Sequence, residues 1–175
     1  MLHCPFDELL NFVEVETAWH QIAWGSEENK IKYNAPWNAT GMFRIRTWRC
    51  PQAGVDHLLW AADLKLDESM GVEPGSENYG QPTYQAIEAK EILDLYRWWK
   101  FTRPERPDPY DISGWSSYCA KLDRKHKRLF GSRTPEERAE SGKLLDKLHR
   151  IEEEYENEDT EMLCRLMKIR RSLWT

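Results

Sequence analysis

The segment YRWWKFTRPERPDPYDISGW, residues 96–115, separates two parts of the chain whose sequence patterns differ. It contains three tryptophans, three arginines and three prolines within twenty residues. Pro104, Pro107 and Pro109 fix their own φ angles and disfavour the α-helical region for the residue before each of them. The sequence therefore predicts a stiff, extended, polyproline-like connector over residues 104–114, with folded regions on both sides.

The region before the connector, residues 1–103, is predicted to be an α+β domain. Apolar residues recur at helical spacing over residues 6–24, which favours a helix there with a break near residue 15, although residues 13–16 also alternate as a strand would. Residues 42–50 and 57–67 alternate between apolar and polar, and a short Pro/Gly loop joins them, as is typical of an antiparallel β-hairpin. In the second run the alternation places Trp60 on the apolar face, which is expected to be buried. A helix over residues 84–101 is expected to cover the apolar face of this hairpin.

Between the predicted hairpin and that helix lies the polar segment ESMGVEPGSENYGQP, residues 68–82. It contains three glycines and two prolines, which predict a loop. Loops of this length are uncommon in compact domains and often carry function.

The region after the connector, residues 115–175, is predicted to be helical. Thr134, Pro135 and Glu137 match the start of a helix with a capping box. Apolar residues then recur at steps of mostly three or four, at Leu144, Leu148, Ile151, Tyr155, Met162, Leu166, Ile169 and Leu173. This spacing resembles a coiled-coil seam, so we expect a homo-oligomer. Two arrangements remain open: one helix of about forty residues, or a hairpin of helices that turns at 157–160.

Composition limits the classes of function. The net charge is −5, and residues 1–87 carry six Lys and Arg against twelve Asp and Glu. This acidic balance argues against a protein that coats nucleic acid, although local basic patches stay open. The four cysteines are scattered without metal-binding spacing, which indicates reduced thiols. With no apolar run of about eighteen residues and no basic, apolar signal at its start, the chain is expected in the cytoplasm, without a membrane partner.

The connector and its flanks form the first candidate binding surface. Its aromatic and arginine side chains are Trp98, Trp99, Arg103, Arg106 and Trp115. Arginine stacked on indole can hold a nucleobase, a phosphate or a protein partner. The alternative is that the tryptophans belong to the core and that the arginines pair with Glu105 and Asp108.

A basic helix face forms the second candidate. Its cations follow helical spacing at Lys121, Arg124, Lys125 and Arg128. Clustered cations attract phosphates, so this face predicts nucleic-acid binding. The alternatives are a solvated face and neutralisation by the acidic run at residues 152–161.

An acidic pattern forms the third candidate. The form EExxE, then fifteen residues, then ExxD places carboxylates at Glu136, Glu137, Glu140, Glu156 and Asp159. This pattern resembles the metal-binding residues of all-α nucleoside triphosphate pyrophosphatases of the MazG type. The resemblance implies Mg²⁺ held between carboxylates of two facing helices, a ligand set that suits this hard cation. A single unbroken helix would not let the two groups face each other.

The run from Asp67 to Cys119 resembles small uncharacterised proteins encoded by tailed bacteriophages, and three segments carry the resemblance. They are LDESMGVEPGSENYGQPTYQA (66–86), LYRWW (95–99) and RPERPDPYDISGWSSYC (103–119). The resemblance implies a bacterial host cytoplasm or a virion as the setting. We therefore expect a non-enzymatic interaction protein that engages a host protein or a nucleotide, of the host-takeover or anti-defence type. No catalytic residue, metal ligand or cofactor is assigned.

Overall fold

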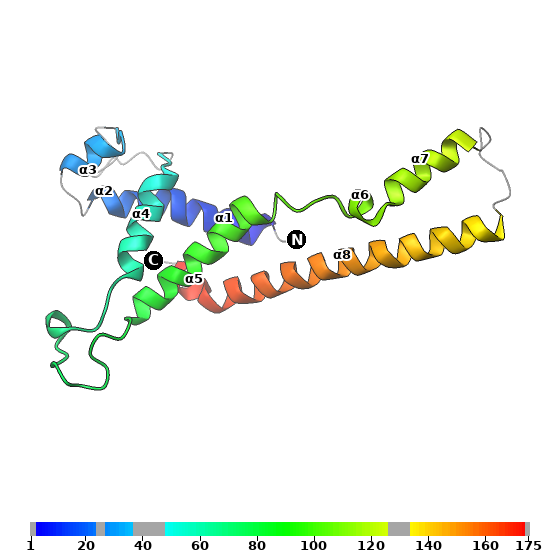
Figure 1. The fold of residues 1–175 in the computed structure, drawn as a ribbon. Helices are drawn as coiled ribbons and strands as arrows, with labels where there is room; N and C mark the ends of the chain where they lie inside the picture. The colour runs from blue at the N-terminus through cyan, green and yellow to red at the C-terminus, as the bar shows by residue number, and fades with distance from the viewer. Residues whose placement is uncertain (1–2, 24–26, 37–47, 126–133, 174–175) are drawn as a thin grey trace. The chain divides into compact units, whose positions relative to one another are not determined.

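The computed structural model describes residues 3–23, 27–36, 48–125 and 134–173, and over these ranges the chain is helical (Figure 1). The elements are α1 (His3–Asn11), η1 (Phe12–Thr17), α2 (Ala18–Ala23), α3 (Glu27–Lys32), α4 (Pro51–Ala62), η2 (Glu68–Met70), α5 (Tyr84–Arg97), η3 (Trp98–Thr102), α6 (Pro109–Ser113), α7 (Trp115–Lys125), α8 (Pro135–Ile169) and η4 (Arg170–Leu173). Of these, η1 and η3 are π-helical, whereas η2 and η4 are 3₁₀ turns. No helix in the described ranges is long and apolar enough to cross a membrane.

The predicted antiparallel β-hairpin is wrong, and with it the α+β fold class. Much of its second segment lies in α4, and residues 42–47 of its first segment lie outside the described residues. Among the described residues, β-type pairing is limited to an isolated bridge between Lys65 and Pro82. The protein is helical.

The packing of α4 explains why the alternating pattern was misleading. Gly54, Leu58 and Ala62 are buried at steps of four residues, which matches a helix. Pro51 occupies the first turn, where its missing N–H leaves no broken hydrogen bond. Trp60, which the alternation placed on the buried face, is 59% exposed. Contacts with neighbouring helices therefore override the local period of two.

The chain divides into two compact units. Unit 1 comprises Met1–Thr102 and Leu163–Thr175, and unit 2 comprises Arg103–Met162. The last turns of α8 thus belong to unit 1, whereas its longer N-terminal part belongs to unit 2.

In unit 1, α4 packs against η1, α2 and α5. Its approach to η1 is close, because a Cβ atom on Gly54 would overlap the carbonyl oxygen of Val13 and lie 2.8 Å from that carbonyl carbon. The same carbonyl accepts a hydrogen bond from the hydroxyl of Thr17 at 2.6 Å. Glycine at position 54 therefore permits this contact between two helices.

Aromatic stacking fills another part of the unit 1 core. Phe6 stacks on Trp99 with ring centroids 4.6 Å apart, and it contacts Trp98 at 5.3 Å. Trp98 and Trp99 are both buried. They lie in η3, which continues the helix that begins at Tyr84. The helix predicted over residues 84–101 is thus present.

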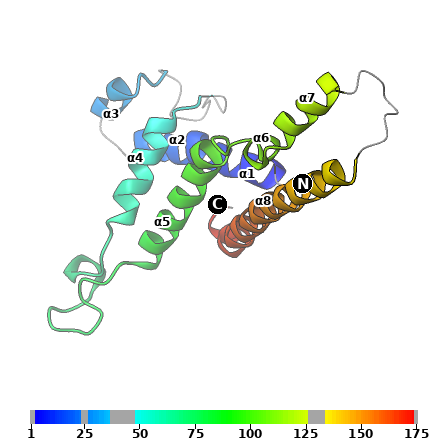
Figure 2. The same cartoon turned by 45° about the vertical axis from the view of Figure 1, so that its right-hand side comes forward.

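A long loop joins α4 to α5 and projects beyond the ends of both helices (Figures 1 and 2). Backbone hydrogen bonds close its base, from Leu66 N to Gln81 O and from Gly80 N to Leu66 O, both at 2.8 Å, and from Thr83 N to Leu64 O at 3.1 Å. The Thr83 hydroxyl then caps α5 by accepting the Ala86 N–H at 3.0 Å. The loop predicted from the sequence is present.

In unit 2, the predicted extended connector is partly helical. Residues 103–105 form a turn, in which Arg106 N donates to Arg103 O at 3.3 Å. Pro109 then starts α6, and the side chain of Asp108 caps it by accepting the Tyr110 N–H at 2.9 Å. A proline in a first helical turn leaves no hydrogen bond unmade, which explains why a helix forms there.

The choice between one helix and a hairpin after residue 134 is settled in favour of one helix. α8 runs unbroken from Pro135 to Ile169 (Figure 1). The predicted capping box is present, with Thr134 N bonded to a Glu137 carboxylate oxygen at 2.9 Å and Glu137 N bonded to the Thr134 hydroxyl at 3.2 Å.

Packing within the chain uses much of the predicted coiled-coil seam. Leu144 lies 3.6 Å from a Cβ built on Gly114, and Leu148 is buried. Further along α8, Leu166 and Ile169 are buried in unit 1. These contacts give the seam an intramolecular role, and the homo-oligomer stays a prediction.

Candidate functional site

The connector arginines form ion pairs within unit 2. Arg103 contacts the carboxylate of Asp159 at 2.9 Å, and Arg106 contacts the same carboxylate at 2.7 Å. Arg106 also pairs with Glu158 at 2.9 Å, and its guanidinium lies 4.9 Å from the ring centre of Tyr155. Burial raises the pKa of Asp159, but hydrogen bonds from the two arginines outweigh this and lower it. The partners are thus distant in sequence, and differ from the expected Glu105 and Asp108.

The connector tryptophans also pack against other residues of the chain. Trp98 and Trp99 are buried in the core of unit 1, as the alternative interpretation expected. Trp115 is half-buried and stacks on Tyr118 in unit 2, with ring centroids 5.7 Å apart. The five predicted binding residues around the connector therefore contribute to packing and ion pairing inside the chain.

The basic helix face lies on α7. Lys121 and Arg124 are exposed, and within the described ranges neither forms an ion pair. The side chain of Lys125 and all of Arg128 fall outside the described residues. Two residues of the acidic run, Glu158 and Asp159, pair with the connector arginines. The described contacts thus give no support to neutralisation of this face by the acidic run.

The pyrophosphatase-like carboxylates all lie on α8. Glu140 and Glu156 are sixteen residues apart, which along one helix is about 24 Å. Glu137 is used in the capping box and Asp159 in the arginine pairs. In the described part of the chain, no group of three or more His, Cys, Asp and Glu residues is placed to hold a metal ion. One copy of the chain therefore does not bring these carboxylates together.

A buried ionic network was missed by sequence reasoning. Glu14 in η1 is only 4% exposed and bonds to Lys100 at 2.6 Å, Arg49 at 2.7 Å and the Tyr96 hydroxyl at 3.0 Å. Burial raises the pKa of Glu14, but these hydrogen bonds outweigh it and lower that pKa. The network joins the π-helical segments η1 and η3. Its polar groups satisfy one another, which suits a structural role.

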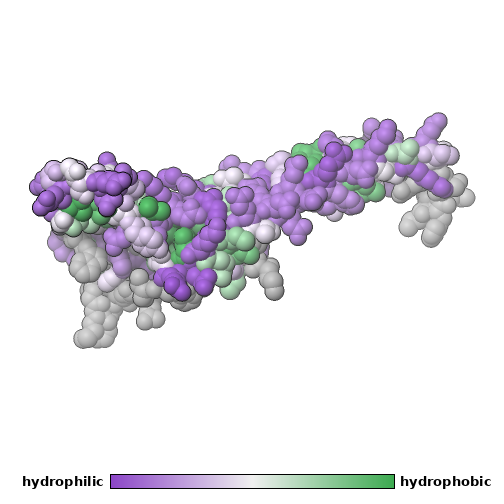
Figure 3. Space-filling model, turned by 90° about the horizontal axis from the view of Figure 1, so that it is seen from below, coloured by the Kyte–Doolittle hydropathy of each residue, from purple (hydrophilic) through white to green (hydrophobic). Residues whose placement is uncertain are grey.

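The strongest candidate surface is the end of unit 1 where α4 meets α5. We call residues 59–88 the α4–α5 corner. Six of the eleven exposed large hydrophobic residues that the structure describes lie in it, namely Leu59, Trp60, Met70, Tyr79, Tyr84 and Ile87. Of these, Tyr84 is 75% exposed. Figure 3, which views the molecule from below, shows small hydrophobic patches set among hydrophilic residues.

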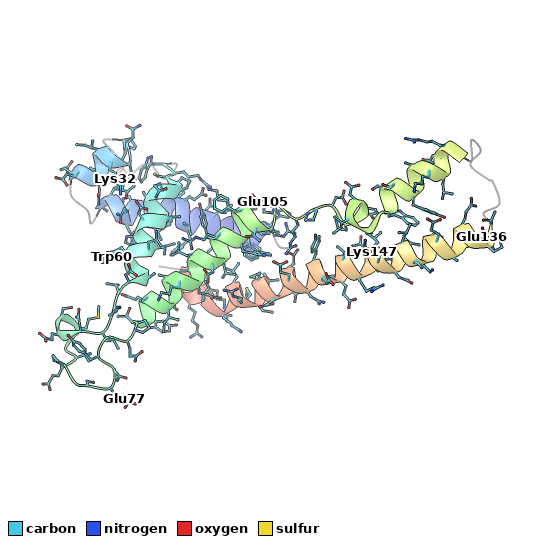
Figure 4. The ribbon with its side chains drawn as sticks, viewed as in Figure 1. Lys32, Trp60, Glu77, Glu105, Glu136 and Lys147 are labelled. Carbon is cyan, nitrogen blue, oxygen red and sulfur yellow. The ribbon has the colours of Figure 1, made fainter. Side chains whose placement is uncertain are left out.

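The α4–α5 corner is also acidic. Its carboxylates are Asp63, Asp67, Glu68, Glu73, Glu77 and Glu88, against the single cation Lys65. Figure 4 shows Trp60 on α4 and Glu77 on the projecting loop. Aromatic groups beside carboxylates suit a partner that is both apolar and positively charged.

Local hydrogen bonds hold the loop of the corner in shape. Asp67 accepts the Ser69 N–H at 2.9 Å and the Ser69 hydroxyl at 2.5 Å, and these bonds lower the pKa of Asp67. Gly71 and Gly80 adopt φ angles of 78°, which other residues rarely tolerate. Together with the closed base, these features present the loop as an ordered surface.

A pocket of about 330 Å³ adjoins the corner. It is lined by Phe12, Glu16, Thr17, His20, His57, Leu58, Trp60, Ala61, Leu64, Gln85, Glu88, Ala89, Ile92 and Ser172. The His20 and His57 rings meet edge to face at 5.8 Å. Burial, and then the nearby His20, lower the pKa of His57, which favours a neutral imidazole. A pocket with polar groups and an aromatic wall is a general mark of ligand sites.

A second cavity, of about 550 Å³, lies between α1, η1 and the last turns of α8 in unit 1. Its walls are mainly apolar, with Pro5, Phe12, Leu166, Met167 and Leu173 among them. No feature of these walls indicates the chemistry of an occupant.

Sequence reasoning found the loop of the corner but not its exposed aromatic residues. The length and glycine content of residues 68–82 indicated a functional loop. Trp60 was assigned to a buried face, because the helical register of α4 was not recognised. Comparison with protein-family models, with curated proteins and with solved structures finds no match to this chain.

Proposed function

We propose that this chain is a non-enzymatic interaction protein that binds a basic, partly apolar segment of a partner protein through the α4–α5 corner. The observation that carries the proposal is the coincidence of six exposed large hydrophobic residues with six carboxylates and one lysine over residues 59–88. The resemblance to tailed-bacteriophage proteins supports a partner in a bacterial cell.

Apolar and charged groups would contribute differently to the binding of a partner. Aromatic side chains such as Trp60 and Tyr84 provide most of the contact energy when a partner covers them. The surrounding carboxylates attract cations, which speeds association and selects against acidic partners. The same carboxylates repel phosphate, so a nucleotide does not suit this surface.

Three synthetic amphipathic peptides of equal length test the proposal. They share apolar positions and carry lysine, glutamine or glutamate at all other positions. We expect the lysine peptide to bind the full chain most tightly and the glutamate peptide not to bind. Trp60→Ala and Tyr84→Ala should each weaken binding about tenfold, the change that corresponds to 1.4 kcal/mol and is typical of an aromatic contact residue.

The matched control is Phe101→Ala, because Phe101 is an aromatic residue outside the corner that is 52% exposed. Its removal should leave peptide affinity unchanged. Equal binding of the three peptides, or an equal effect of Phe101→Ala and Trp60→Ala, would refute the proposed surface.

One observation favours nucleic-acid binding by α7 as a second candidate. Lys121 and Arg124 are exposed and without an ion pair among the described residues. Exposed cations on one helix attract phosphate groups. The test is the salt dependence of binding to a short DNA duplex and to a single strand, which must be steep if phosphate contacts provide the affinity. Binding that does not change with salt would exclude this candidate.

A further inference from the structure

The pocket and the α4–α5 corner share part of their surface. Trp60, Gln85 and Glu88 line the pocket and belong to the corner. Trp60 and Gln85 are also exposed, so the pocket can be reached from the surface that is proposed to bind a partner. A side chain of the bound segment could therefore enter it.

The charged groups that line the pocket favour a cation. Among the described residues, its lining includes Glu16 and Glu88 but no lysine or arginine. Glu88 accepts a hydrogen bond from the Ser172 hydroxyl, and its bond to Tyr84 raises the pKa of that tyrosine. Both partners are hydroxyl groups, and in the described residues Glu88 has no ion pair. Its carboxylate therefore remains available for an ion pair with a cation that enters the pocket.

The aromatic wall favours a flat cation. The Trp60 ring lies 5.5 Å from that of His57, at an angle of 40°. An indole face attracts a cation, and a guanidinium group can stack on it while it donates hydrogen bonds in its own plane. Glu88 offers carboxylate oxygens and Gln85 an amide oxygen as acceptors near that wall.

We infer that this pocket accepts the guanidinium group of one arginine in the partner segment, stacked on Trp60 and paired with Glu88. This inference rests on the proposed function, because it assigns an anchoring residue to the same partner. An arginine suits the site better than a lysine, since an ammonium group neither stacks nor forms a forked pair with a carboxylate.

The test uses the lysine-rich peptide with one central arginine, and versions with citrulline or lysine in its place. Citrulline keeps the shape of arginine and removes the charge. With the full chain, we expect at least tenfold weaker binding of the citrulline peptide and an intermediate affinity for the lysine peptide. Glu88→Gln should reduce the arginine-to-citrulline ratio to below about threefold, because the coupling between the two charges is removed.

Two controls test whether the preference for arginine arises in the pocket. Glu73→Gln removes a carboxylate of the loop that does not line the pocket, and it should leave the ratio unchanged. Gln85→Lys places a cation at the exposed edge of the pocket and should abolish the preference for arginine, whereas Gln81→Lys on the loop should not. Because positions 85 and 81 are exposed, both variants should fold.

The outcomes separate this inference from the proposed function. If the basic peptides bind with equal affinity whether they carry arginine or citrulline, the pocket has no such role while the interaction surface stands. A preference for arginine that persists in Glu88→Gln also refutes the assignment. If no basic peptide binds, both the surface and its pocket are refuted.

Discussion

Gly54→Ala should destabilise unit 1, although alanine is the better helix former. A Cβ atom at this position would overlap the carbonyl oxygen of Val13 and lie 3.0 Å from the Thr17 hydroxyl oxygen. The obstacle is backbone, which cannot rotate away as a side chain can. Overpacking costs about 1–3 kcal/mol, and this site belongs at the upper end. The gain in helix propensity of about 1 kcal/mol leaves a net loss of about 2 kcal/mol.

Gly142→Ala is the matched control. Gly142 lies inside α8, and in the described part of the chain no atom beyond its chain neighbours and the adjacent helix backbone lies within 4 Å of a Cβ built on it. Only the propensity term then applies, so this variant should gain about 1 kcal/mol. For a chain of this size, the midpoint of thermal unfolding should fall by about 4–8 °C for Gly54→Ala and rise by about 2–4 °C for Gly142→Ala.

The two units require separate probes of unfolding. Eight of the nine tryptophans belong to unit 1, so tryptophan fluorescence reports mainly on Gly54→Ala. Far-ultraviolet circular dichroism follows the helices of both units and reports on Gly142→Ala. If Gly54→Ala stabilises unit 1 as Gly142→Ala stabilises α8, the close approach of α4 to η1 is refuted.

Four further predictions concern charged groups. Lys100→Met should destabilise unit 1 by about 1–3 kcal/mol, since it leaves the buried Glu14 with fewer partners; urea unfolding measures this. Because the pKa of Glu14 lies below its usual 4.5 in the folded chain, the stability from its ion pairs is present above that value and is lost as pH falls through the folded pKa, a loss that Glu14→Gln should reduce in acid-unfolding curves. Asp159→Asn should lower the resistance of residues 103–108 to proteolysis, because two arginines lose their shared partner. Lys121→Gln and Arg124→Gln should each reduce the slope of log affinity for DNA against log salt concentration by about 1 if α7 contacts phosphates.

Local signals predicted the elements whose ends depend on nearby residues. Thr83 caps α5 and Thr134 begins the capping box of α8, and both interactions span only three residues. The loop at residues 68–82 follows from its own glycines and prolines. The interpretation of residues 57–67 as a strand failed because α4 is defined by packing against η1, α2 and α5, which no local pattern reveals.

The ion pairs of the connector also depend on the fold and not on nearby residues. Glu105 and Asp108 were the nearest acids to the connector arginines, yet Arg103 and Arg106 bind Asp159, more than fifty residues away. The folding of unit 2 decides this choice, because it brings Asp159 of α8 to Arg103 and Arg106. The two arginines are therefore structural in the described residues, whereas the fold leaves the large hydrophobic side chains of the α4–α5 corner exposed.

The acidic loop of the α4–α5 corner makes salt dependence the property that tests its role most directly. Asp67, Glu68, Glu73 and Glu77 are exposed within residues 67–82, a stretch of the loop that contains no lysine or arginine. Like charges on a loop with a closed base repel one another, and a basic partner would relieve this repulsion as it binds. Added salt would screen both effects. We therefore expect salt to weaken binding of the lysine peptide, while the contacts of Trp60 and Tyr84 preserve a residual affinity that salt does not remove. A purely electrostatic surface would lose all affinity, and an apolar surface would lose none. Only a partial loss of affinity with salt fits a corner that contains both aromatic and acidic side chains.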